Sequence, residues 1–159
     1  MKFNSALRNF VLVLFSTLLI SACSTAKKAA VDTVDDVYTG TETVEFLAKG
    51  VPDRVFFATN KSKLTTRSRD TLRKQATWLR KNKDVTVTIE GHADERGTRE
   101  YNLALGERRA NAAKDYLMTY GVSGKRMTVI SYGKEKPVNP ASTPLAWSQN
   151  RRSVTVKTN

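Results

Sequence analysis

Four short runs of β-forming residues, separated by longer segments, constrain the fold of residues 51–159 more than any other feature of the chain. Val85-Thr86-Val87-Thr88-Ile89 alternates apolar and polar residues, as a strand does when one face of its sheet is covered. The four predicted strands are Arg54–Ala58, Val85–Ile89, Met127–Tyr132 and Ser153–Lys157.

Two segments between these strands carry apolar or small residues at helical spacing. The first has Leu64, Ser68, Leu72, Ala76 and Leu79, with Thr65 or Thr66 as its cap, and the second has Leu103, Gly106, Ala110, Ala113, Leu117 and Tyr120, followed by Gly121 as its C-cap. Alternating strands and helices predict one α/β (α+β) sandwich in which two helices cover a single sheet. Residues 133–152 read mainly as a loop, with one helical turn near Leu145–Asn150.

Residues 1–22 have the order of a secretory signal. Lys2 and Arg8 come first, the apolar run Phe10–Ile20 follows, and small residues close the segment. A helix that spans a membrane needs about 20 apolar residues, and this run is much shorter. We expect residues 1–22 to be removed as a signal peptide, with an uncleaved membrane anchor as the alternative.

The single cysteine, Cys23, directly follows Leu19-Ile20-Ser21-Ala22. This order resembles the lipobox of bacterial lipoproteins, in which the signal is removed before the cysteine and acyl chains are attached to it. A lone thiol forms no internal disulfide, so lipidation also accounts for one cysteine in an exported chain. The resemblance implies that Ser24, in place of an acid, favours transport to the outer membrane. An incidental apolar cysteine is the alternative.

Residues 23–50 carry small, polar and acidic residues without a sustained period, and we predict a lipidated N-terminus and flexible tether there, followed by one domain at 51–159. Removing residues 1–22 leaves 25 basic and 15 acidic groups, a net charge of about +10. Such a surface attracts polyanions, including nucleic acid, anionic lipid and acidic wall polymers. Export argues against nucleic acid as the partner. Because of the positive charge, a general binder of other polyanions remains one alternative function.

The stretch Glu90–Asn111 gathers the only histidine with several carboxylates and arginines. Glu90 is predicted to end a strand, residues 91–98 to form a loop, and a helix to begin near Arg99. Asp94 and Arg109 would then face one another around a ligand. Such a pair suits a zwitterion, since Asp accepts from an ammonium and Arg grips a carboxylate through two parallel hydrogen bonds. A loop-to-helix salt bridge between the two is the structural alternative.

Metal binding and catalysis have less support in this stretch. Zinc sites use three or four N, S or O ligands, and the chain has one histidine and one cysteine. A cell-wall hydrolase built on His92 with Asp94 and Glu95 would need a partnered nucleophile or a metal. We therefore predict no enzyme, metal or cofactor, and we expect His92 to pack or hydrogen-bond inside the loop while Glu95 and Arg96 form a solvated surface.

Three motifs carry a resemblance to a known family. GHADERGTREYNLALGERRANAAKDYL at 91–117, VISYGKEKP at 129–137 and NRRSV at 150–154 closely resemble the peptidoglycan-associated lipoproteins, Pal, and more broadly the OmpA-like C-terminal domain. The resemblance runs through residues 51–157. It implies the OmpA-like βαβαββ fold on a four-stranded mixed sheet, and noncovalent binding of the peptidoglycan stem peptide through its diaminopimelate residue.

The same resemblance assigns roles to individual residues. It implies that Asp94 takes the ammonium of diaminopimelate and Arg109 its carboxylate, while Asn102 and Leu105 match the N-x-x-L element between them and Leu105 closes the apolar side. The implied protein ties the outer membrane to the cell wall through acylated Cys23, works with the Tol system in envelope integrity and cell division, and binds the periplasmic protein TolB at a surface that overlaps the peptidoglycan site.

One position departs from the family pattern. Relatives commonly have Phe-Asp-x-Asp-Lys after the first strand, whereas this chain has Phe57-Ala58-Thr59-Asn60-Lys61. Asn60 can still donate and accept hydrogen bonds, but it offers no charge to an ammonium. We expect Asn60 to belong to the ligand site and binding to depend more strongly on Asp94 and Arg109.

Overall fold

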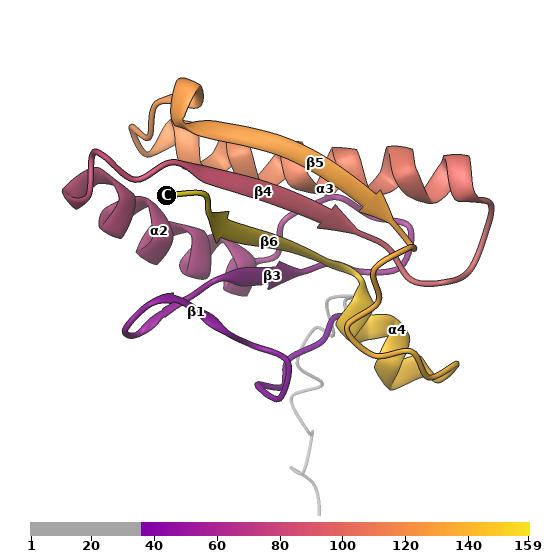
Figure 1. Ribbon diagram of the computed structural model, residues 1–159. Helices are drawn as coiled ribbons and strands as arrows, with labels where there is room; N and C mark the ends of the chain where they lie inside the picture. The colour runs from indigo at the N-terminus through magenta and orange to yellow at the C-terminus, as the bar shows by residue number, and fades with distance from the viewer. Residues whose placement is uncertain (1–35) are drawn as a thin grey trace, which may run out of the picture. The chain divides into compact units, whose positions relative to one another are not determined.

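The computed structural model describes residues 36–159, and four of its strands form one mixed sheet in the order β3-β6-β4-β5 (Figure 1). β6 runs antiparallel to both β3 and β4, and β4 runs parallel to β5. The strands are β3 (Arg54–Phe56), β4 (Val87–His92), β5 (Met127–Gly133) and β6 (Arg152–Lys157). The predicted βαβαββ sandwich is confirmed.

The strand ends differ from the predicted ones because neighbouring strands, and not local alternation, set them. β4 begins at Val87, which pairs with Met127 and Lys157, and it continues through Gly91 to His92 with an irregularity at its end. Val85 was predicted to begin this strand, but its carbonyl accepts the Arg126 Nε–H (2.8 Å) instead. His92 therefore lies in the strand, whereas the sequence predicted it in the following loop.

Two long helices begin at threonine caps. α2 (Thr66–Lys81) is capped by Thr65, whose Oγ1 accepts the Ser68 N–H (3.1 Å), and α3 (Arg99–Thr119) is capped by Thr98, whose Oγ1 accepts the Tyr101 N–H (3.2 Å). α3 ends where Gly121, at φ +82°, donates its N–H to Met118 O (2.9 Å), the left-handed ending that glycine favours. The two predicted helices, the Thr65 cap and the ending at Gly121 are confirmed, and Thr98 is a cap that the sequence analysis did not identify.

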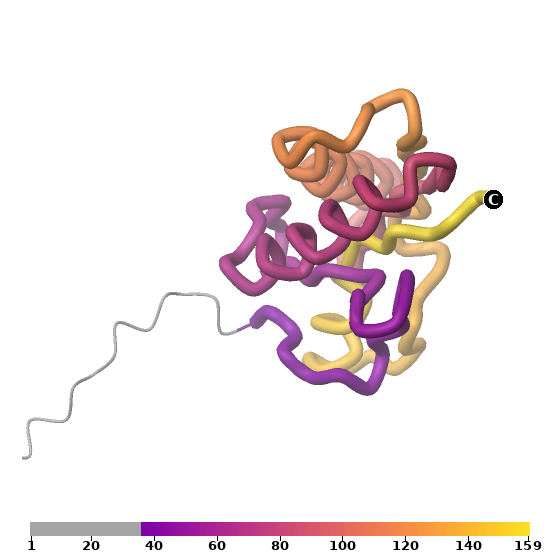
Figure 2. Tube along the Cα trace, turned by 90° about the vertical axis from the view of Figure 1, so that its left-hand side faces the viewer, coloured from indigo at the N-terminus to yellow at the C-terminus, as the bar shows by residue number. Residues whose placement is uncertain are grey.

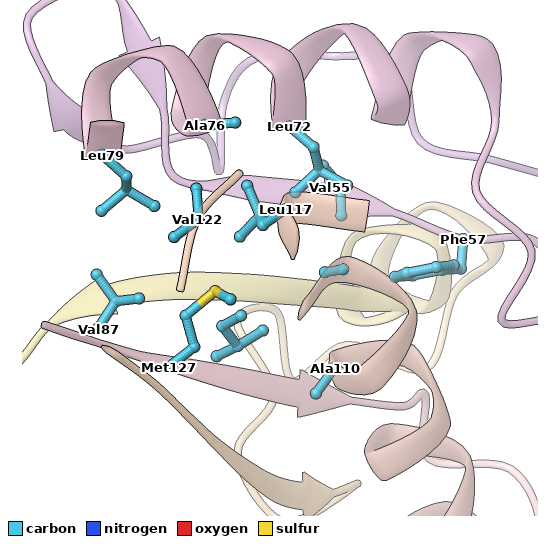
Figure 3. Close-up of a cluster of buried hydrophobic side chains, with 12 residues drawn as sticks. Val55, Phe57, Leu72, Ala76, Leu79, Val87, Ala110, Leu117, Val122 and Met127 are labelled. Atoms are coloured by element: carbon cyan, nitrogen blue, oxygen red, sulfur yellow. The ribbon is translucent and has the colours of Figure 1, made fainter. Parts of the chain in front are cut away.

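The apolar core lies between these two helices and one face of the sheet (Figure 3). A fully buried aliphatic side chain contributes about 1.5–3 kcal/mol relative to an exposed one. Because side chains alternate across β4, Val87 and Ile89 face the helices. The core consists of Val55, Phe57, Leu72, Ala76, Leu79, Val87, Ile89, Ala110, Ala113, Leu117, Val122 and Met127.

β4 and α3 touch through two glycines. A Cβ added to Gly91 would lie 1.8 Å from Gly106 O, and one added to Gly106 would lie 2.9 Å from Gly91 O and 2.4 Å from Ser131 Oγ. No other residue fits at either position without moving the backbone, since the obstructing atoms belong mainly to backbone.

The N-terminal part of the described chain packs against the domain, although the sequence predicted a tether up to residue 50. β1 (Phe46–Ala48) and β2 (Val51–Pro52) form a small antiparallel hairpin in which Leu47 is buried. The Tyr38 ring is also buried and meets the Phe56 ring edge-on at 4.8 Å. Figure 2 shows residues 36–50 in indigo beside the yellow C-terminal segments. Apolar side chains spaced far apart in a polar segment give no periodic signal, so the sequence pattern missed this packing.

A shorter helix, α4 (Pro144–Asn150), lies at the end of the sheet where β4 stops and β6 begins, and confirms the predicted turn there (Figure 1). A one-turn 3-10 helix, η1 (Gly124–Arg126), precedes β5. Within residues 36–159, no helix has the length and apolar character needed to cross a bilayer. The predicted signal peptide, the lipidation site Cys23 and tether residues 23–35 lie outside the described residues.

Candidate ligand-binding site

The chain passes from β4 to α3 through residues 93–98, here called the site loop. At one end, Ala93 N–H donates to Gly133 O (2.8 Å), which holds the loop to the end of β5. At the other end, Thr98 caps α3 and its carbonyl accepts the Asn102 N–H (3.1 Å). Hydrogen bonds therefore fix both ends of the loop that contains Asp94.

The Asp94 carboxylate is buried and accepts four hydrogen bonds. Oδ1 accepts from the backbone N–H and Nε–H of Arg96 (both 3.1 Å), and Oδ2 accepts from Arg96 Nη2 (2.7 Å) and Arg151 Nη1 (3.3 Å). Burial alone would raise the pKa of Asp94, but the hydrogen bonds from Arg96, supported by Arg151, bring that pKa below its usual value. Asp94 is therefore an ionised, preorganised carboxylate at neutral pH.

Arg109, which is 0% exposed, binds backbone carbonyls and no carboxylate. Its Nε donates to Lys61 O (2.9 Å), Nη1 to His92 O (2.8 Å) and Nη2 to Ala58 O (3.1 Å). Burial lowers the pKa of Arg109 to about 10, and the charge of Arg151 acts in the same direction while that of Asp94 opposes it. The side chain stays charged at neutral pH and ties the end of β4 to the turn after β3.

The structure brings Asp94 and Arg109 to the same end of the sheet but does not pair them. Asp94 forms its ion pairs with Arg96 and Arg151, and Arg109 hydrogen-bonds to three carbonyls. The alternative of a direct loop-to-helix salt bridge is therefore wrong. The two charges thus lie at one end of the sheet, each with partners of its own.

Arg151 belongs to this site, although the sequence analysis gave it no role. The buried guanidinium donates from Nε to Phe57 O (3.1 Å) and from Nη1 to Asp94 Oδ2 (3.3 Å). It also donates from Nη2 to the backbone carbonyl of Asp36. The only signal in the sequence was its place in the NRRSV motif, because its partners lie far away along the chain.

Asp36 is a second residue that the sequence analysis missed. Its Oδ2 accepts the Thr59 N–H (2.6 Å) and lies 3.5 Å from Arg151 Nη2. Burial alone would raise the pKa of Asp36, but hydrogen bonding to Thr59 and the charge of Arg151 lower it below its usual value. A carboxylate from the N-terminal segment is therefore held at the edge of the predicted site.

Asn102 and Leu105 are both buried on α3. Asn102 donates from Nδ2 to Arg96 O (2.9 Å), which closes the site loop onto the first turn of the helix. Leu105 lies three residues further along the same helix, on its buried side. Their immediate structural role is to hold the loop and α3 together.

Asn60 lies in a tight turn between β3 and α2. Its backbone is left-handed, with φ 55°, and Lys61 N–H donates to Ala58 O (3.1 Å) across the turn. Asparagine tolerates this conformation better than most residues. The structure therefore gives Asn60 a backbone role, and its exposed side chain lies in the turn that Arg109 holds.

Glu95 and Arg96 are both exposed, as predicted, but each also makes specific contacts that the sequence did not indicate. Arg96 binds Asp94 and stacks 4.3 Å from the centre of the Trp147 ring. Glu95 accepts from Trp147 Nε1 (2.8 Å) and Ser142 Oγ (3.1 Å). Trp147 lies in α4, far along the chain, so no local pattern could reveal these contacts.

His92 is 2% exposed and packs 5.5 Å from the Tyr132 ring. Neither ring nitrogen has a hydrogen-bond partner within residues 36–159, although Nε2 lies 3.5 Å from Glu90 Oε2. Burial, together with the positive charges of Arg152 and Lys136, lowers its pKa to about 3. A buried neutral ring does not favour the hydrolase alternative. In the part of the chain that the structure describes, no three His, Cys, Asp or Glu side chains gather as a metal site would require.

Comparison with known proteins matches residues 56–151 to the OmpA family. A relative from Brucella melitensis, named peptidoglycan-associated lipoprotein, is 44% identical over 150 residues, which cover 91% of this chain and 89% of the relative. The chain belongs to the OmpA family, among its peptidoglycan-associated lipoproteins.

Two further members of the family agree with this placement. A peptidoglycan-associated lipoprotein from Rhizobium meliloti is 58% identical over 106 residues, 67% of this chain, and the match spans 60% of that relative's length. The crystal structure of the peptidoglycan-associated lipoprotein from Burkholderia pseudomallei has a TM-score of 0.65 and 37% sequence identity, and the match covers 67% of this chain and 90% of that one. Both relatives are named for association with a polymer and not for a reaction.

Proposed function

We propose that this chain binds the peptide stem of peptidoglycan noncovalently and holds the outer membrane to the cell wall without catalysing a reaction. The observation that carries the proposal is the buried, ionised Asp94 beside the guanidinium groups of Arg96 and Arg151, with Arg109 behind them. A site with fixed negative and positive groups suits a zwitterion, and the names of the relatives support a wall ligand.

The free end of diaminopimelate carries an ammonium and a carboxylate on the same carbon atom. In the proposed complex, Asp94 accepts the ammonium. A carboxylate has about four lone-pair positions, and Asp94 already accepts four hydrogen bonds, so the ammonium must replace one donor. Arg96 is the more exposed of the two arginines and already stacks on Trp147, so its guanidinium is the group displaced.

The remaining predicted residues support the same complex. Arg109 is fully buried and uses three of its five N–H donors on backbone carbonyls, so it acts on the ligand carboxylate through its fixed positive charge. Asn102 and Leu105 hold the loop and the helix in position, and Asn60 sets the neighbouring turn. In this assignment, Asp94 balances the charge of the ligand's ammonium and Arg109 that of its carboxylate.

The proposal includes the attachment of the chain and its partners. Acyl chains on Cys23 would anchor the protein in the inner leaflet of the outer membrane, with the domain facing the periplasm. Each buried methylene adds about 0.8 kcal/mol, so several chains on one residue give firm anchoring. Holding the domain beside a lattice of repeated sites raises its local concentration, and weak individual binding then suffices. Association with TolB and the Tol system, in envelope integrity and cell division, completes the proposal.

Asp94→Asn and Arg109→Lys test the site directly. Loss of the charge at Asp94, or of the planar fork at Arg109, should weaken retention on isolated diaminopimelate-containing peptidoglycan about tenfold or more. Asp115→Asn, an exposed acid six residues beyond Arg109 on α3, makes the matched charge change outside the site. Thermal unfolding of each variant would establish that it remains folded.

Unchanged retention of a folded Asp94→Asn variant would contradict the proposal. A general polyanion surface would instead lose affinity steeply as salt increases and tolerate loss of Asp94, because it depends on lysine and arginine alone. Release of soluble wall fragments that stops in a His92→Ala variant would establish the hydrolase alternative.

A further inference from the structure

The carboxylate of Asp36 occupies a position in the site where a ligand carboxylate would fit. Its Oδ2 accepts the Thr59 N–H at 2.6 Å and lies 3.5 Å from Arg151 Nη2. A backbone N–H and a guanidinium that converge on one oxygen form an anion site, because both donate and one carries positive charge.

Arg151 connects this position to Asp94. Its Nη1 donates to Asp94 Oδ2 (3.3 Å), while Nη2 faces Asp36. One buried guanidinium therefore lies between the two carboxylates. A ligand ammonium on Asp94 and a ligand carboxylate in place of Asp36 would be neighbours, as the two charged groups of an α-amino acid are.

The donors at this position have partners besides Asp36, although Arg151 also donates to the Asp36 backbone carbonyl. Arg109 fixes the turn that contains Thr59 by bonding to Ala58 O (3.1 Å) and Lys61 O (2.9 Å). Arg151 is held by Phe57 O (3.1 Å) and by Asp94. The Asp36 side chain, by contrast, is 42% exposed. The donors are thus fixed, and their occupant is the part that can leave.

We infer that the Thr59 N–H and the Arg151 guanidinium form the carboxylate-binding half of the site, and that Asp36 fills it as an internal substitute for the carboxylate of the wall peptide. This inference rests on the proposed function and extends it, because it names the donors and a competitor within the chain. In this structure the protein's own side chains fill both halves of the site. Arg96 occupies the ammonium position on Asp94, and Asp36 occupies the carboxylate position.

An internal competitor closes the site in part of the molecules, and the apparent affinity equals the affinity of the open site multiplied by the fraction of molecules that are open. Removing the charge of Asp36 should therefore strengthen ligand binding about three- to tenfold. Variants of Asp94 act in the opposite direction, since they remove a group that binds the ligand. The two kinds of variant separate the inference from the proposed function.

The test titrates the mature chain with a soluble stem peptide that ends in meso-diaminopimelate, using calorimetry. Asp36→Asn and Asp36→Ala should both bind more tightly than the wild type, and the control Asp115→Asn should bind equally to it. A second ligand with the free carboxylate of diaminopimelate converted to an amide should show no gain in either Asp36 variant, because it brings no anion to the vacated position.

Several outcomes would overturn the inference. Equal or weaker binding of both Asp36 variants, with Asp94→Asn still defective, would mean that Asp36 does not compete, while the proposed function would stand. An equal gain for the acid and the amide would mean that Asp36 blocks the site by its bulk alone. Binding that is indifferent to Asp94 would refute the proposed function, and the inference with it.

The Thr59 amide gives an independent readout by nuclear magnetic resonance. Its proton should shift when Asp36→Asn removes the charged acceptor, and shift back when the acid ligand saturates the variant. A Thr59 resonance that ignores the ligand in both proteins would contradict the assignment. Thermal unfolding of the same samples would establish that both remain folded.

Discussion

Two parts of the interior are equally closed to solvent but use opposite chemistry. Leu72, in the apolar core, and Arg109, on α3 with its side chain against the end of β4, are both 0% exposed. Leu72 packs among aliphatic side chains, where burial is favourable and non-directional. Arg109 is tolerated only because three carbonyls accept its N–H groups. The apolar region therefore holds the helices to the sheet, and the polar region sets the positions of individual loops.

This difference extends to the cost of change. Apolar cores accept substitutions of similar volume, since no single contact has a required direction. A buried ionic cluster depends on each partner, and removing one leaves another buried and unsatisfied. Variants in the apolar region should affect stability alone, whereas variants in the polar region should affect ligand binding as well.

Leu72→Ala should have the largest effect on stability. Truncation of this buried leucine leaves a cavity and should lower the free energy of unfolding by about 2–5 kcal/mol. Affinity for the stem peptide, measured at a temperature where the variant is folded, should match that of the wild type. Urea unfolding and calorimetric titration would measure the two quantities, and a parallel loss of affinity would contradict the separation of the two regions.

His92→Gln should change how stability depends on pH. In the folded chain burial lowers the pKa of His92 to about 3, whereas an unfolded chain takes up that proton below its ordinary value of 6.5. Stability should thus fall as the pH drops below 6.5, with a slope of at most about 1.4 kcal/mol per pH unit. Between pH 6.5 and 5 the wild type should lose about 1.5–2 kcal/mol from this residue.

The upper part of this pH range isolates His92. The pKa values of Asp94 and Asp36 are lowered in the folded chain, so their stabilisation is lost only at a pH below their ordinary value of 3.8. Urea unfolding at several pH values should give a flatter curve for His92→Gln than for the wild type above pH 5. Identical slopes for the two proteins would show that His92 is not held neutral.

Removing the N-caps of α2 and α3 should have the smallest effects on stability, and the two variants are closely matched. Thr65→Ala and Thr98→Ala each remove the N-cap hydrogen bond of a helix, from α2 and α3, and Thr65 also loses a bond to Ser68 Oγ (3.0 Å); each variant should lower stability by about 1 kcal/mol. Only Thr98 also ends the site loop, so only its variant should weaken binding of the stem peptide. Equal affinities in both variants would mean that the loop keeps its position without the cap.

The apolar half of this comparison could be predicted from the sequence. The spacing of Leu72, Ala76 and Leu79 and the alternation of Val87 and Ile89 reflect a period that one helix or strand imposes locally. Those side chains do form the core. The Thr65 cap and the turn of helix near Leu145 are also local signals, and the structure bears them out.

The polar half could be predicted only in part. The family motif located Asp94 and Arg109, but their partners come from distant segments that meet only in the folded chain. Asp36 lies 115 residues from Arg151, with which its backbone carbonyl bonds, and Trp147 lies 52 residues from Glu95. No periodicity along the chain records such contacts, which explains why the contacts of Arg96 with Asp94 and Trp147 were missed and why Asp36 was assigned to a tether.

The contact between Gly91 and Gly106 fixes the distance between the two backbone segments that carry Asp94 and Arg109. Gly91 is three residues before Asp94, and Gly106 is three residues before Arg109. Since the two backbones already touch, the separation of the two charges is set by the smallest distance that a strand and a helix allow. A single methyl group at either glycine would push the strand and the helix apart, and so change the distance between the two charges and the ligands that fit between them.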